Sequence, residues 1–244
     1  MLQLAQAGVS LIDGLGFPTK GQGDLEATWK GRPDAPTDAV SAEDAAWAQV
    51  TAAEMRTLVT TLVRMKTAVA PMLRAADAQR EDGPTDELDF VPDRTRGTVM
   101  SRVAKATTPA AQERRTRARA QRFAFVKAFV GAGGTLVLSS GARADGYPAP
   151  GLALHKEMAL LIEAGLTPAQ VWRAASANGA VLLGDTERRI RLRASSPADF
   201  FLVSGDPLAD LAPLSQIALL VRNGETLDRA ALLRRVSRAR GVVK

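Results

Sequence analysis

The clearest hydrophobic pattern lies between residues 151 and 184, where it predicts two helices joined by a short corner. The first helix has one apolar face, made of Leu154, Met158, Leu161 and Ile162. Gly165 ends this helix, because glycine adopts the left-handed conformation at a helix end without steric cost. Thr167 and Gln170 then form a capping box, and the second helix is expected to continue to a stop at Gly184.

Upstream of this region, short apolar runs alternate with helical stretches. The runs cover residues 9–12, 67–73 and 135–138. A capping box at Thr51 and Glu54 predicts a helix after the first run, and Thr108 predicts the start of a long helix to about Val130. Strands separated by helices indicate parallel β/α units, so the expected fold class is α/β.

The segments between these elements have weaker patterns. Residues 19–39 are rich in glycine, proline and charge, which predicts a long surface loop carrying Trp29. Ser41 with Asp44 predicts the capped start of a short helix, and residues 74–97 are expected to be charged and irregular.

The C-terminal part changes character. Residues 197–208 contain a short apolar run closed by a Gly-Asp-Pro turn. A second run covers residues 217–222 and ends at Asn223-Gly224, a strong signal for a β-hairpin. We therefore expect residues 1–190 to form the β/α region, 191–228 a β-rich tail of the kind found in a β-sandwich, and 229–244 a basic C-terminal helix or tail.

Composition excludes several classes of protein. The chain has no cysteine, so disulfides and thiolate metal sites are absent, and it contains no apolar run near the ~20 residues of a membrane-spanning helix. The first residues do not resemble a signal peptide. A cytoplasmic location is the default expectation, and the location is unknown if an N-terminal segment is missing. The net charge of +6 comes largely from arginines at residues 114–122 and 229–244, but no stacking aromatics accompany them, so nucleic acid is an unexpected partner.

Three ordered blocks resemble a known family. They are LHKEMALLIEAGLTPAQVWRAASANGAVLLG, PADFFLVSGDPLADL and LLVRNGE, and they are similar to the C-terminal end of the amidohydrolase superfamily, in its imidazolonepropionase-like and Xaa-Pro-dipeptidase-like branch. The resemblance implies a partial (β/α) barrel, about the last three units of a TIM-like barrel, followed by a tail from a composite β-sandwich. The barrel strands would be AGVSLIDGLG, TAVAPML and GGTLVLSSGA.

The same resemblance implies a site that uses one or two divalent metals such as zinc to activate water for hydrolysis. The family histidine that follows the first of these strands falls on Gly14, and the family aspartate that follows the last falls on Gly141. Glycine has no side-chain donor, so these ligand positions are degenerate and no cofactor is expected in this chain. Asp13 and Asp145 lie nearby as candidate substitutes, each out of register with the family ligand.

Three further residues are candidates for the site or its support. His155 is the only histidine, and the family does not use the histidine at this place as a principal metal ligand, which favours a structural role over a catalytic one. Glu157 is a candidate structural or pocket-rim acid. Asn178 interrupts an apolar helix face, so it is expected to bond backbone groups rather than a ligand.

The leading hypothesis is therefore a protein resembling metal-dependent hydrolases of C–N bonds, in amides, peptides or cyclic amides, that is inactive or incomplete as this chain. The alternative is an active hydrolase half completed by a separate N-terminal chain, and a third is an arginine-rich nucleic-acid-binding module. An open sheet edge would expose unpaired backbone groups, so self-association or a complementary chain is the expected partnership.

Overall fold

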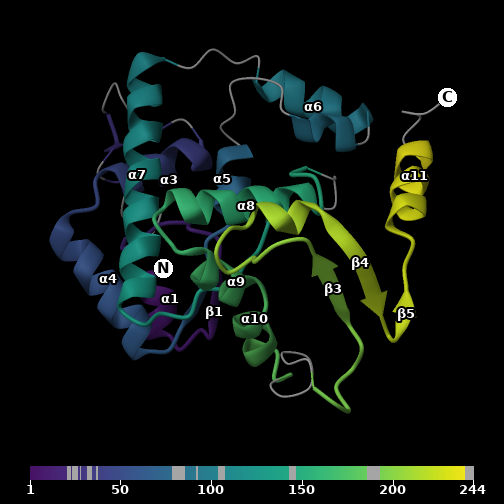
Figure 1. Cartoon of the computed structure of the whole chain (residues 1–244). Coiled ribbons are helices and arrows are strands. Elements are labelled where there is room, and N and C mark those ends of the chain that lie inside the picture. Colours follow the sequence, from purple (N-terminus) through teal and green to yellow (C-terminus); the bar gives the residue numbers. More distant parts are fainter. Residues whose placement is uncertain are drawn as a thin grey trace.

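The computed structural model describes residues 1–20, 23, 27, 29–31, 35–36, 38–78, 86–91, 93–103, 108–142, 147–185 and 193–239. The chain is a mixed α/β protein (Figure 1). Its N-terminal elements are α1 (Leu2–Gln6), β1 (Leu11–Asp13), α3 (Ala39–Ala48), α4 (Ala52–Arg64), β2 (Ala68–Ala70), α5 (Leu73–Ala78), the 3₁₀ helix η1 (Asp86–Phe90), α6 (Asp93–Val103) and α7 (Pro109–Gly131). They are followed by α8 (Leu152–Glu163), α9 (Pro168–Ala175), α10 (Ala177–Leu182), β3 (Phe200–Val203), the 3₁₀ helix η2 (Ala212–Ser215), β4 (Ile217–Arg222), β5 (Glu225–Thr226) and α11 (Arg229–Ala239).

A short parallel sheet lies at the centre of the N-terminal region. β1 pairs in parallel with β2, and Ile12 lies opposite Val69. The third predicted strand is reduced to one parallel bridge, in which Val69 donates to the carbonyl of Thr135 at 3.0 Å and accepts from the N–H of Val137 at 2.9 Å. The parallel direction of the first two strands is confirmed, whereas a set of three full barrel strands is not.

On the side facing away from β2, residues 135–138 are hydrogen-bonded to the corner between α9 and α10. The side-chain amide of Asn178 donates to the carbonyl of Leu136 at 2.7 Å, and the N–H of Leu138 donates to the carbonyl of Ala174 at 2.9 Å. These bonds use backbone groups that a further strand would need. Within the described residues, the sheet is therefore open only beside β1.

The main core lies on the face of this sheet that carries Ile12, Val69 and Leu136, where helices cover it. Helix α7 runs upright along one side, and α8 lies across the middle of the molecule (Figure 1). Phe125 of α7 packs between aromatic rings, with centroid distances of 5.6 Å to both Trp47 and Phe129.

Four of the described helices, α3, α4, α7 and α9, start at a side-chain cap. The capping boxes at Thr51 with Glu54 and at Thr167 with Gln170 are confirmed, and Thr108 caps α7. The predicted start at Ser41 is wrong, because Asp38 is the N-cap of α3. Its carboxylate accepts from the N–H of Ser41 at 2.8 Å, which places Ser41 at the third helical position.

Two other expectations are corrected. The single helix predicted up to Gly184 is interrupted at Ser176, whose backbone leaves the helical region and whose hydroxyl donates to the carbonyl of Trp172 at 2.7 Å. This break turns α10 so that Asn178 reaches the sheet. The expectation of an irregular segment at 74–97 is also wrong, because most of α5, all of η1 and the start of α6 form there from short, charged sequences without a clear apolar period.

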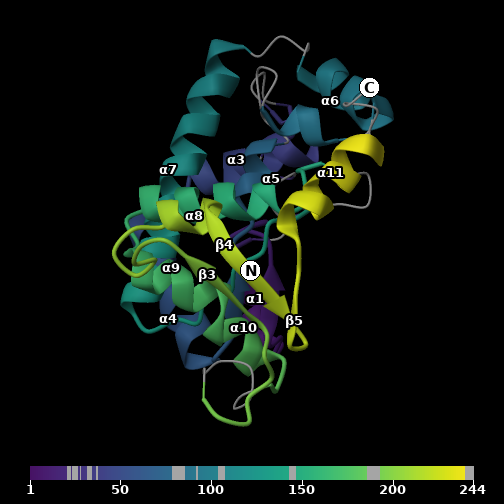
Figure 2. The ribbon, with the colours of Figure 1, turned by 45° about the vertical axis from the view of Figure 1, so that its right-hand side comes forward.

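The C-terminal region is a separate antiparallel sheet in the order β3-β4-β5. The turn at Asn223-Gly224 has the positive φ values, 51° and 80°, that this dipeptide tolerates, which confirms the hairpin. Phe201 of β3 contacts Trp172 edge to face, so the sheet is anchored to α9. Helix α11 lies beyond β5 at the outside of the molecule in both views (Figures 1 and 2). No helix in the described ranges is long and apolar enough to cross a membrane.

Candidate functional site

Three chain segments meet where the parallel strands end, and we call residues 13–14, 71–72 and 139–141 the strand-end site. The N–H of Gly14 donates to the carbonyl of Ala70 at 2.8 Å, which ties the end of β1 to that of β2. The carboxyl ends of parallel strands are where α/β enzymes place their chemistry. The strand-end site is therefore the place to examine for a catalytic centre.

The side chain of Met72 fills the space between the two glycines of this site. A Cβ atom at Gly14 would lie 3.8 Å from Met72 Sδ. A Cβ atom at Gly141 would lie 2.5 Å from both Met72 Cε and Ala75 Cβ, closer than real side chains approach. Both glycines also have positive φ, 87° at Gly14 and 61° at Gly141. A larger residue at Gly141 would require both α5 and Met72 to move.

The other candidates that the structure describes do not come together as a metal centre. Asp13 is exposed at the end of β1, and His155 is exposed on α8. Asp145 lies outside the described residues. Across the described ranges, no group of three or more His, Cys, Asp or Glu side chains is arranged to hold a metal ion. The described residues therefore do not form a ligand set for the one or two divalent metals that the resemblance implies.

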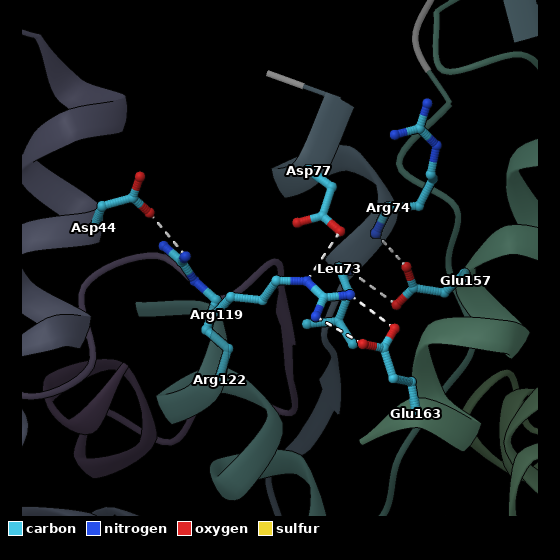
Figure 3. Close-up of polar contacts among 8 residues, drawn as sticks. All are labelled: Asp44, Leu73, Arg74, Asp77, Arg119, Arg122, Glu157 and Glu163. Atoms are coloured by element: carbon cyan, nitrogen blue, oxygen red, sulfur yellow. Dashed lines mark hydrogen bonds and ion pairs between the residues drawn. The ribbon is translucent and has the colours of Figure 1, made fainter. Parts of the chain in front are cut away.

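A buried acidic residue, Glu157, is hydrogen-bonded to the backbone that adjoins this site. It comes from α8, is fully buried, and its carboxylate accepts from the N–H groups of Leu73 at 2.9 Å and Arg74 at 2.6 Å (Figure 3). These two residues directly follow Met72. Burial raises the pKa of Glu157 to about 7, although the two backbone hydrogen bonds and the charge of Arg74 act in the opposite direction.

A buried ionic cluster lies next to Glu157. The guanidinium of Arg74 donates to the carboxylate of Glu87 and, at 3.2 Å, to the hydroxyl of Tyr147. Glu87 also accepts from the N–H of Ala149 at 2.9 Å and forms an ion pair with Lys156 at 3.4 Å. Sequence reasoning missed Arg74 and Glu87, because both lie in the segment that was expected to be irregular and neither belongs to a recognisable motif.

A charged hollow of about 490 Å³ opens between α5, α7 and α8. At its centre Arg119 forms two parallel hydrogen bonds of 2.8 Å with Glu163 and lies 3.6 Å from Asp77 (Figure 3). The hydrogen bonds to Glu163 hold the pKa of Arg119 above its ordinary value, and the same bonds lower the pKa of Glu163. The charges at the centre of this hollow thus satisfy one another.

Another ion pair fixes α7 to α3 within the core. Arg122 Nη1 donates to Asp44 Oδ1 at 2.8 Å, and both residues are at most 3% exposed. The Arg122 guanidinium also lies 5.8 Å from the ring centroid of Trp47. This pair lies outside the strand-end site and has the environment of a structural contact.

Comparison with known proteins gives a likeness in fold. No protein-family model matches the chain, and no curated protein sequence matches it. A proposed prolidase from Bifidobacterium longum is 19% identical with a TM-score of 0.50, over 96% of this chain and 61% of that one. A Xaa-Pro dipeptidase with bound methionine in the active site is 14% identical with a TM-score of 0.48, over 78% of this chain and 42% of that one.

Molinate hydrolase is 14% identical with a TM-score of 0.47, over 94% of this chain and 40% of that one. The chain thus spans less than two thirds of each of these solved proteins. The likeness to the Bifidobacterium protein agrees with the expected resemblance to the amidohydrolase superfamily, as a likeness of fold over part of a longer protein.

Proposed function

We propose that this chain is a non-catalytic, amidohydrolase-like subunit that binds or assembles without a catalytic metal. One observation carries the proposal. Gly14 and Gly141 occupy the positions that the resemblance assigns to metal ligands, and Met72 fills the space between them. Zinc sites in proteins use thiolate, imidazole or carboxylate ligands, and manganese and magnesium sites use oxygen ligands, so the Met72 side chain supplies none of the usual ligands of these ions.

The proposal follows from what metal-assisted hydrolysis requires. The ion must be held by several nitrogen or oxygen donors and must keep an open position for the water that it activates. At the strand-end site, the carboxylate of Asp13 is exposed, and the Met72 side chain lies between Gly14 and Gly141. One exposed carboxylate does not replace a set of ligands.

Metal content tests this proposal directly. We expect the purified chain, incubated with zinc or manganese and then desalted, to retain well below one equivalent in elemental analysis and to leave a Xaa-Pro dipeptide intact. An established zinc dipeptidase treated in parallel provides the positive control. Retention of one or two equivalents together with hydrolysis would overturn the proposal and favour an active hydrolase.

The assembly part of the proposal rests on the outer edge of β1. The bonds of Ser10 and Gly14 to β2 place the backbone groups of Leu11 and Asp13 on the opposite side of the strand. In the described part of the chain, no strand pairs with that side. An open edge of a parallel sheet is a template for another strand, from a second copy or from a complementary chain.

We therefore expect the isolated chain to self-associate, with a mass above the 25.8 kDa of the monomer in light scattering coupled to size-exclusion chromatography. Leu11→Pro removes an outward N–H group and is expected to shift the protein toward monomer. The matched control is Leu202→Lys on β3, at a side chain that is 49% exposed on the other sheet. A monomeric wild-type chain, or equal effects of both variants, would argue against β1 as the contact.

A further inference from the structure

We propose that Glu157 is a latch that holds Met72 in the strand-end site, and that loss of its negative charge lets Met72 leave. This inference rests on the proposed function only in that it concerns the same metal-free site. The latch joins α8 to the first residues of α5 through the bonds that Leu73 and Arg74 donate to the carboxylate. Both bonds lie on the backbone that follows Met72.

The backbone of Met72 shows why a latch is needed. Its φ is 52°, in the left-handed region that is unfavourable for a residue with a side chain. Gly14, which directly follows β1, faces the sulfur of the Met72 side chain, since a Cβ atom there would lie 3.8 Å from Sδ. The methionine therefore has an unfavourable backbone conformation, and the two bonds to Glu157 fix the backbone that directly follows it, because a carboxylate accepts N–H bonds more strongly than a neutral group does.

Some of the charged groups around Glu157 favour its ionised form, and others disfavour it. On α5, the negative charge of Asp77 disfavours the carboxylate and the positive charge of Arg74 favours it. Arg74 is itself paired with Glu87 of η1, which also pairs with Lys156 of α8. Arg119 of α7 is engaged by Asp77 and by Glu163.

Protonation would change the bonds that define the latch. A carboxylate accepts strongly on both oxygens, whereas a carboxylic acid carries a proton on one of them, so one of the two N–H groups of α5 is left with a much weaker acceptor. The pKa of about 7 places this change near neutral pH. With the latch open, Met72 can relax to a negative φ and uncover Gly14 and Gly141, which would make room for a small ligand at the strand ends.

The experiment follows Met72 and the two amides together. The chain has six methionines, and methyl-labelled methionine with Met72→Leu for assignment identifies the signal by NMR. Between about pH 5 and pH 9, we expect the Met72 methyl shift to titrate in step with the amide shifts of Leu73 and Arg74. Hydrogen exchange at these amides, corrected for intrinsic rates, should be about 10- to 100-fold faster at the acidic end.

The variant Glu157→Gln should fix the Met72 signal at its low-pH position throughout the range. The control is Glu163→Gln, an exposed acid on the same helix, which should leave the titration as in the wild type. A Met72 methyl that does not titrate, or one that titrates in Glu157→Gln as in the wild type, overturns the latch. If Glu157→Gln does not fold, the wild-type and Glu163→Gln titrations decide alone. Metal content is a separate measurement, so failure of the latch is distinguishable from failure of the proposed function.

Discussion

Replacing Asp44 with alanine is expected to lower the free energy of unfolding by about 3–5 kcal/mol. The ion pair between Asp44 and Arg122 is buried on both sides, and removing the carboxylate leaves the guanidinium charged in the core beside Trp47. Arginine cannot escape this cost by losing its proton in the physiological range. Urea unfolding followed by tryptophan fluorescence measures the change.

The matched control for this prediction is Arg117→Ala on α7. Arg117 pairs with Glu113 four residues earlier, and the two side chains are 66% and 64% exposed, so its loss should change the free energy of unfolding by about 0.5 kcal/mol or less. The double replacement Asp44→Leu with Arg122→Met removes both buried charges and should recover much of the loss. Equal, small effects of Asp44→Ala and Arg117→Ala would show that the buried pair contributes no more than an exposed one.

The free energy of unfolding is expected to fall by about 3 kcal/mol between pH 4.5 and pH 7 through Glu157 alone. Its pKa is raised by burial from 4.5 to about 7 in the folded chain. Between these values the folded chain binds more protons than the unfolded chain, so stability decreases as pH rises. Below pH 4.5 both states are protonated and this contribution is fully present, and above pH 7 it is lost.

Comparison of stability curves isolates the contribution of Glu157 from that of other titrating groups. Glu157→Gln carries no charge, so its free energy of unfolding should lack this decrease when measured by urea titration across the same range. Glu163→Gln should keep the decrease, because hydrogen bonding to Arg119 lowers rather than raises the pKa of Glu163. Parallel curves for the wild type and Glu157→Gln would contradict the raised pKa.

Local chemistry accounts for what the sequence predicted well. The capping boxes at Thr51 and Thr167 and the turn at Asn223-Gly224 depend on residues within a few positions of one another, so their patterns are visible in the chain. The break at Ser176 was not predictable in this way. It depends on Asn178 reaching the carbonyl of Leu136, a residue 42 positions away whose location only the folded chain reveals.

In the candidate site, too, some residues could be predicted from the sequence and others depend on contacts between distant parts of the chain. The resemblance singled out Gly14 and Gly141 as the family's ligand positions, and in the structure both glycines lie next to the side chain of Met72. The role of Met72 could not be predicted, because a single methionine after a short apolar run gives no sign of its positive φ or its direction. Glu157 was a candidate, but its partners on α5 lie 83 and 84 residues away, and its burial follows from their packing.

The corner that brings Asn178 against Leu136 also limits how copies of this chain can join. One edge of the parallel sheet is already occupied by the chain's own amide and carbonyl groups, so, as far as the described residues show, another strand can be added to this sheet only beside β1. If two copies pair their β1 strands about a two-fold axis, neither copy keeps an open sheet edge, and the result is a closed dimer. This geometry resists fibre growth, since a filament needs a ladder that can be lengthened at both ends.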